Sequence, residues 1–113
     1  MALELLITFR DPKRKKVFHP FSFQIVLRRA WWPVAKRLCL PLLQQLECLD
    51  ITKRSDAEQL IRELEVVRSA LLHPEDVIVS EEDAAYMLKR IGEVEPLIRK
   101  AIDEWADVES VSL

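Results

Sequence analysis

The stretch Leu3–Leu27, LELLITFRDPKRKKVFHPFSFQIVL, decides whether this chain contains any sheet. Residues 3–9 are too short for periodicity to separate strand from helix, but their β-branched side chains favour a strand. An Asp-Pro pair and the basic run at 13–16 then indicate a turn. In residues 17–27 the side chains alternate in a way that suits a strand pairing back onto residues 3–9. We therefore predict an N-terminal β-hairpin, with a helix beginning near Leu27.

Helix is the alternative for the second half of that stretch. Ser22 has the side chain of a helix N-cap, so a helix could already begin at Phe23. The composition of the whole chain also favours helices, because it contains a single glycine and tight hairpin turns often need glycine at positive φ. Residues 3–27 are therefore either a hairpin or an extended segment that leads into a helix.

Two segments in the middle of the chain have the apolar spacing of helices. Apolar side chains recur every three or four residues between Ala35 and Leu49, and Pro41 is expected to kink or divide this helix. A capping box formed by Ser55 and Glu58 predicts the start of the next helix, which ends at the His-Pro pair after residue 72. Both helices are expected to pack an apolar stripe against a common core.

The last helical segment is the longest. Ser80 is its expected N-cap, followed by three acids in the first turn, where the helix dipole favours them. The apolar phase continues across Gly92 and Pro96, although Glu95 occupies one position where an apolar residue is expected. We therefore predict one long, kinked helix over 81–107, with an αα-hairpin turning at the glycine as the alternative.

These segments together predict the fold class. The chain has 113 residues and 50% hydrophobic residues, which suits one domain of ordinary size covering residues 1–113. We predict a mainly α protein: a compact bundle of three to four helices with a short N-terminal β-hairpin or extended segment.

Charge is divided unequally between the two halves of the chain. Residues 1–54 contain eleven Lys and Arg against four Asp and Glu, whereas residues 55–113 contain six against fifteen, so the halves carry +7 and −9 and the chain carries −2. Neither half is low in complexity, so neither reads as a charged tail. We expect opposite charges within one packed body to moderate each other's field.

The segment RRAWWPVAKR, residues 28–37, is the candidate binding site. As continuous helix it would present a cationic arc of about 100° that includes one tryptophan, with Trp31 on the opposite, core-facing side. Such an arc could stack bases and contact phosphates. The simpler interpretation, which we favour, is that the tryptophans bury their bulk and the cations pair with the acidic half. The candidate binding residues are Arg28, Arg29, Trp32, Lys36 and Arg37.

No motif in the sequence predicts catalysis, a cofactor or a metal. His19 and His73 each precede a proline and are interpreted as turn residues. The acids near residues 75–83 lack the alternating pattern and the glycine of a calcium loop. Cys39 and Cys48 are interpreted as buried free thiols. We therefore expect a protein that is not an enzyme.

The expected function is binding. No apolar run approaches the ~20 residues that cross a bilayer, and the basic residues near the start follow the apolar stretch rather than precede it, so we expect a cytoplasmic protein without a membrane partner. We predict that it acts by protein–protein interaction, through self-association as a homo-oligomer or by inhibiting a partner. The alternative is binding of single-stranded or double-stranded nucleic acid through residues 28–37.

Overall fold

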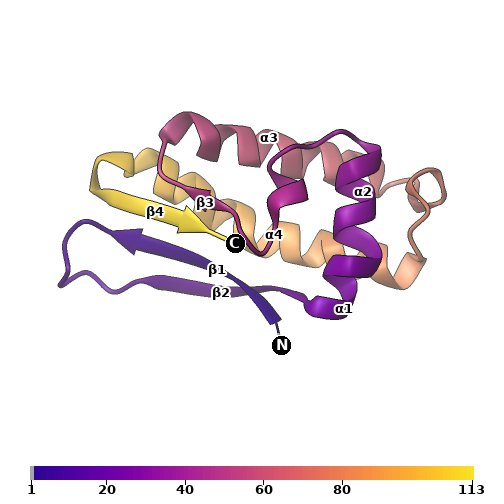
Figure 1. Ribbon diagram of the computed structural model, residues 1–113, viewed down its shortest axis with the longest axis horizontal. Coiled ribbons are helices and arrows are strands. Elements are labelled where there is room, and N and C mark those ends of the chain that lie inside the picture. Colours follow the sequence, from indigo (N-terminus) through magenta and orange to yellow (C-terminus); the bar gives the residue numbers. More distant parts are fainter. Residues whose placement is uncertain (1) are drawn as a thin grey trace.

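The computed structural model describes residues 2–113 and contains a four-stranded antiparallel sheet with two long helices behind it (Figure 1). The strand order is β2-β1-β4-β3. The strands are β1 (Ala2–Phe9), β2 (Val17–Phe23), β3 (Asp50–Ile51) and β4 (Val108–Ser112). The sheet thus joins both ends of the chain to its middle.

The predicted N-terminal hairpin is confirmed. β1 alternates strictly, with Leu3, Leu5, Ile7 and Phe9 buried on one face, and it pairs antiparallel with β2. The register shifts opposite the Leu3–Glu4 step of β1, so that the successive residues Phe21 and Ser22 of β2 are both buried. A bulge of this kind turns two successive side chains toward the core. The strand continues one residue past Ser22, so this serine is not a helix N-cap.

The prediction of a mainly α bundle is wrong, because the hairpin is only half of the sheet. β4 pairs antiparallel with β1 on one side and with β3 on the other, so that Ile7 and Ile51 both lie opposite Val111. These three side chains are buried. The pairing joins residues about a hundred positions apart, and the five-residue run VESVS carries no local signal strong enough to reveal it.

The segment after the hairpin is helical but interrupted. It consists of α1 (Gln24–Val26), a π-helical turn (Leu27–Trp31) and α2 (Trp32–Arg37). The helix predicted to continue as far as Leu49 ends instead at residue 37, and a short 3-10 turn follows (Leu43–Gln45). Cys39 takes a left-handed conformation with φ of 55°, and the residue before Pro41 is disfavoured in a helix.

The two long helices are α3 (Arg54–Ala70) and α4 (Glu81–Asp103), and the 3-10 turn Pro74–Val77 lies between them. The capping box predicted for α3 is wrong, because the helix begins before Ser55 and its N-cap, Lys53, makes no side-chain cap. The predicted cap of α4 is confirmed, since the backbone N–H of Asp83 donates to Ser80 Oγ at 3.1 Å.

The last helix is not interrupted at either of the two residues that could break it, a glycine and a proline. α4 is continuous through Gly92 and Pro96, so the αα-hairpin alternative is wrong. It ends at Asp103 rather than at residue 107, and the 3-10 turn Trp105–Asp107 leads into β4. The early end leaves Val108 in extended backbone, where it can pair with β1.

The core lies between the inner face of the sheet and the helices. Trp31 is its largest buried side chain at 1% exposed, and its ring lies 4.6 Å from that of Phe21 in β2. Cys39 and Cys48 are both exposed, which corrects the prediction that they are buried. Among residues 2–113, no helix combines the length and the apolar character needed to span a membrane.

Candidate interaction surface

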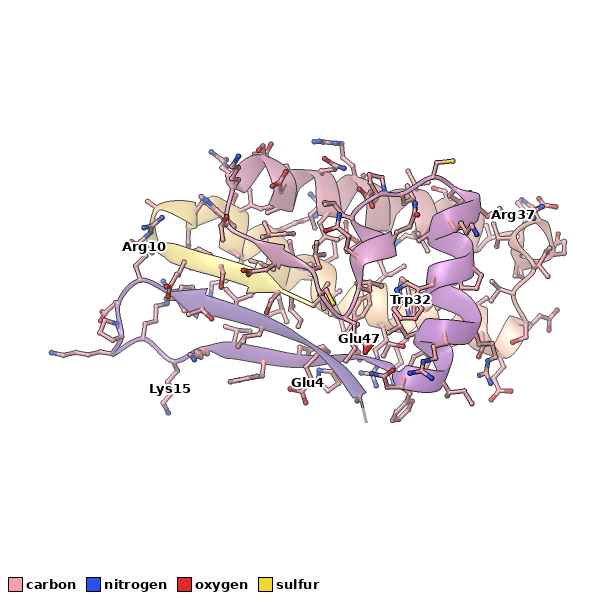
Figure 2. The ribbon with its side chains drawn as sticks, in the orientation of Figure 1. Glu4, Arg10, Lys15, Trp32, Arg37 and Glu47 are labelled. Carbon is pink, nitrogen blue, oxygen red and sulfur yellow. The ribbon has the colours of Figure 1, made fainter. Side chains whose placement is uncertain are left out.

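Four of the five candidate binding residues, the basic ones, lie on the outer side of the helical segment 24–37, and the fifth, Trp32, does not. Residues on the inner side, among them Leu27, Trp31 and Val34, are buried, as the spacing predicts. Trp32 is half-buried and packs against the core, so its ring is not a free platform (Figure 2). The four basic candidates are exposed: Arg28, Arg29, Lys36 and Arg37.

Arg29 differs from the other cations because it is held by a buried carboxylate. Its Nε and Nη2 atoms both donate to Asp83 of α4, each at 2.7 Å. The hydrogen bonding of Arg29 to this carboxylate is the main cause that raises the pKa of Arg29. The pair ties the π-helical turn to the first turn of α4, and it joins the basic half of the chain to the acidic half.

The remaining basic candidates have no such partner. Arg28, Lys36 and Arg37 form no ion pair among residues 2–113. The basic residues of this surface are therefore neither all paired with the acidic half of the chain nor all unpaired. Three exposed charges remain available to a partner.

Two exposed apolar side chains begin the same surface. Phe23 is 55% exposed and Ile25 is 64% exposed, although both are large and hydrophobic. The ring of Phe23 stacks on Tyr86 of α4 at 5.9 Å, and its backbone N–H donates to the tyrosine hydroxyl at 3.2 Å. The sequence pattern did not single out these residues, because alternation in residues 17–27 favoured a buried role for them.

Exposed positions recur along this side every three or four residues, allowing for the extra residue of the π-helical turn. We call this surface the outer stripe. It comprises the exposed residues Phe23, Ile25, Arg28, Arg29, Pro33, Lys36 and Arg37. Aromatic, aliphatic and arginine side chains gathered in this way are the components of protein-binding hot spots.

A second polar cluster joins the two long helices. Glu95 is buried on α4 and accepts hydrogen bonds from Arg99 at 2.7 Å and from Arg68 of α3. Burial alone would raise the pKa of this carboxyl, but the bonds from the two guanidinium groups together outweigh burial and lower it. The acid that interrupts the apolar phase of α4 is thus the centre of an interhelical ion cluster.

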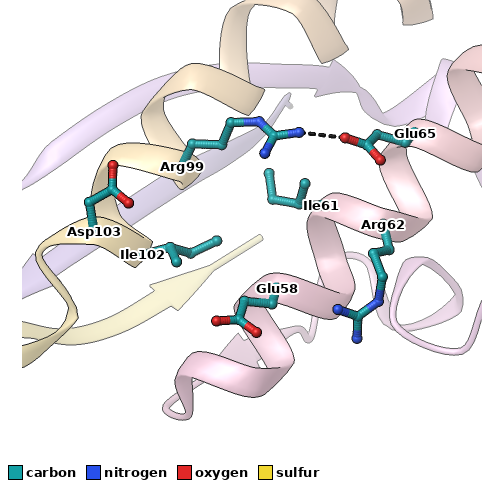
Figure 3. A pocket seen from close by; sticks show the side chains of 7 residues that line it. All are labelled: Glu58, Ile61, Arg62, Glu65, Arg99, Ile102 and Asp103. Carbon is teal, nitrogen blue, oxygen red and sulfur yellow. Dashed lines mark hydrogen bonds and ion pairs between the residues drawn. The ribbon is translucent and has the colours of Figure 1, made fainter.

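A groove of about 420 Å³ opens beside this cluster, between α3 and α4 (Figure 3). Ile61 and Ile102 line it, and an ion pair between Arg99 and Glu65 crosses one end. The groove lies where α3 begins and α4 ends. No sequence motif marks it, since its walls come from two helices whose pairing is a tertiary property.

His19 lies inside β2 rather than in a turn, which corrects its interpretation. Its Nε2 lies 3.2 Å from Glu93 Oε1, and this hydrogen bond is the main cause that lowers the pKa of the glutamate, with Arg90 adding to it. No serine or cysteine is hydrogen-bonded to the imidazole among residues 2–113. In that part of the chain, no three His, Cys, Asp or Glu side chains are placed to hold a metal ion.

Comparison with known proteins was made at three levels. Protein-family models, curated proteins and solved structures all yielded no match to this chain.

Proposed function

We propose that this protein acts by binding another protein through the outer stripe. The observation that carries the proposal is the exposure of Phe23 and Ile25 beside cations that have no carboxylate partner among residues 2–113. Burying both apolar side chains against a partner would remove them from water, at about 25 cal/mol per Å² of apolar surface. The unpaired cations indicate a partner surface that is acidic around an apolar centre.

Protein is a better match to this surface than nucleic acid. Base stacking needs an accessible ring, yet within residues 28–37 Trp31 is buried and Trp32 packs against the core. Arg29 is also committed to Asp83 and is not free for a phosphate. Nucleic-acid binding through residues 28–37 remains the second candidate, supported by the three unpaired cations alone.

We further propose that the protein acts in the cytoplasm. Both cysteines, Cys39 and Cys48, are free and exposed. Free surface thiols persist in a reducing compartment and tend to be oxidised in an oxidising one. The target of the experiment below is therefore a cytoplasmic partner that the protein binds and inhibits.

The experiment is affinity capture from the native cytoplasm with the unmodified protein and with Ile25→Asp. A partner that uses the outer stripe is captured by the unmodified protein and lost from the variant, because a carboxylate replaces the apolar contact and repels an acidic surface. The matched control is Leu72→Asp, which places the same charge at an apolar side chain 70% exposed elsewhere on the molecule.

Titration with labelled oligonucleotides separates the two candidates. We expect that Ile25→Asp does not abolish any oligonucleotide binding seen at low salt. Binding that falls steeply with salt and is lost in an Arg28→Glu variant would contradict the protein-binding proposal and support the nucleic-acid candidate.

A further inference from the structure

The groove between α3 and α4 has an apolar floor, and three carboxylates against two guanidinium groups line it: Glu58, Glu65 and Asp103 against Arg62 and Arg99. Ile61 and Ile102 form the floor. Glu58 and Asp103 stand on the two sides of it, one on each helix (Figure 3). Asp103 forms no ion pair among residues 2–113, and Glu58 pairs only with Arg54, at 3.2 Å and with both side chains largely exposed.

This arrangement suits the side chain of a lysine or an arginine. Such side chains carry an apolar stem and a charged end, so the stem can lie over the isoleucines while the end reaches the carboxylates. The opposite end of the groove is already neutralised by the pair between Arg99 and Glu65. Arg62 of α3 also lines the groove and forms no ion pair among residues 2–113. A cation entering the groove would therefore be directed mainly toward the unpaired Asp103 on α4, and less strongly toward Glu58, which already pairs with Arg54.

The loop between β1 and β2 carries side chains of this kind. Lys13, Lys15 and Lys16 are exposed and form no ion pair among residues 2–113. Figure 2 shows Lys15 projecting from the loop, away from the body of the molecule. The loop thus offers several long cationic side chains that have no partner within their own chain.

The backbone of the loop is held in place. Arg14 donates to Glu104 at 2.6 Å, and its guanidinium lies 3.7 Å from the centroid of the Phe9 ring. The backbone N–H of Lys13 donates to Asp11 Oδ1 at 2.9 Å. An ordered loop loses little conformational freedom when it binds.

Loop and groove lie at the same end of the molecule. The ion pair between Arg14 and Glu104 places the loop beside the end of α4, and the groove includes Ile102 and Asp103 of that same helix end. When two complementary patches share one end, a two-fold axis lets each copy contribute both contacts at once. The association is then closed and stops at a dimer.

We propose that the protein forms a symmetric dimer in which the loop 10–16 of each copy places lysine side chains in the α3–α4 groove of the other. The contact is charge-complementary and apolar at its centre. It uses a surface distinct from the outer stripe, so the dimer does not depend on the proposed function.

The first measurement is sedimentation equilibrium of the unmodified protein from low micromolar to near-millimolar concentration. We expect a monomer–dimer equilibrium whose Kd rises with salt, because exposed charges are screened beyond about 8 Å at physiological ionic strength. A protein that stays monomeric at the highest concentration in low salt would overturn the proposal.

Charge reversal then locates the contact. A loop variant, Lys15→Glu with Lys16→Glu, and a groove variant, Glu58→Lys with Asp103→Lys, are each expected to raise the dimer Kd by about tenfold or more, since each change acts twice in a symmetric dimer. The control for the loop variant reverses two unpaired cations outside the contact, Lys36→Glu with Arg37→Glu, and leaves the Kd unchanged.

Mixing the two variants is the decisive test. In a mixed dimer the acidic loop of one chain meets the basic groove of the other, and the unmodified loop meets the unmodified groove. We therefore expect an equimolar mixture to associate as tightly as the unmodified protein, whereas each variant alone does not. Two variants that are folded by circular dichroism and fail to associate when mixed would overturn the proposal, as would dimers that survive either reversal or an equal effect of the control.

Ile25→Asp distinguishes this proposal from the proposed function. It lies on the outer stripe and is expected to leave the dimer Kd unchanged while it abolishes partner capture. Loss of the dimer in Ile25→Asp would move self-association to the outer stripe and overturn the groove contact.

Discussion

Buried carboxylates show how single residues are accommodated in this protein. Glu63, Asp83 and Glu95 are each about 5% exposed or less, and each has a different kind of partner. The first accepts backbone N–H groups, the second a two-pronged arginine contact, and the third two arginines. A buried charge without such partners costs several kcal/mol, so each acid depends on its contacts.

Glu95 makes stability depend on pH. Its pKa is lowered in the folded protein, so it stabilises the fold above the unfolded pKa of about 4.3, and this contribution is lost as the pH falls through the folded value. We expect Glu95→Gln to lower the free energy of unfolding by about 1–3 kcal/mol at pH 7. The measurement is urea denaturation at neutral and acidic pH, where the difference from the unmodified protein should shrink below pH of about 4.

The control for that prediction is Glu65→Gln. This carboxylate also pairs with Arg99, but it is half exposed, so we expect an effect below about 1 kcal/mol at any pH. An equal loss of unfolding free energy in Glu95→Gln and Glu65→Gln would show that burial does not decide how strongly the ion cluster stabilises the fold.

Secondary-structure elements in this protein end where contacts from other elements require it. The helix α2 ends before Pro41, and Glu63 of α3 then accepts the backbone N–H groups of Leu42 and Leu43, each at 3.0 Å. Gln59 donates to the same carboxylate at 2.8 Å and holds it in place. A side chain twenty residues away thus caps the 3-10 turn.

Replacing Glu63 tests this link between elements. We expect Glu63→Ala to lower the free energy of unfolding by about 1.5–3 kcal/mol, because two backbone donors lose a charged acceptor. Because Glu63→Gln keeps one acceptor oxygen, its free energy of unfolding should lie between those of the unmodified protein and Glu63→Ala. The measurement is chemical denaturation with an unchanged slope, and Glu58→Ala on the exposed side of the same helix is the control. If Glu63→Ala left the free energy of unfolding unchanged, water would be able to replace the carboxylate.

At the scale of the whole molecule, the last strand closes the fold. β4 joins the hairpin to β3, so the two ends of the chain and its middle form a single sheet (Figure 1). Val111 is fully buried at the point where three strands meet. The antiparallel pairing therefore depends on a residue that lies almost at the end of the sequence.

Val111→Asp is expected to prevent folding. A buried, unpaired carboxylate costs more than about 4 kcal/mol, a large part of the 5–15 kcal/mol that stabilises a domain. The neighbouring variant Ser110→Asp, on the open face of the sheet, should fold normally. Circular dichroism and thermal unfolding of the two proteins measure the difference. A stable Val111→Asp protein would contradict the strand order, because only a helical bundle with a loose end would tolerate it.

Local sequence patterns by themselves determined the hairpin, the cap of α4 and its continuity through Gly92 and Pro96, and the inner and outer sides of residues 27–37. Each of these depends on neighbours within one or two turns or along one strand, where a period of two or of three to four residues is decisive. The anomaly at Glu95 was also visible, although its partner Arg68 lies 27 residues away on another helix.

Tertiary structure alone decided the four-stranded sheet, the capping of Leu42 and Leu43 by Glu63 and the groove between α3 and α4. In each case the groups that meet are far apart in the chain, as β1 and β4 are, and no local period encodes their pairing. A five-residue strand is marginal by itself and becomes stable only when strands on both sides complete its hydrogen bonds and bury Val111.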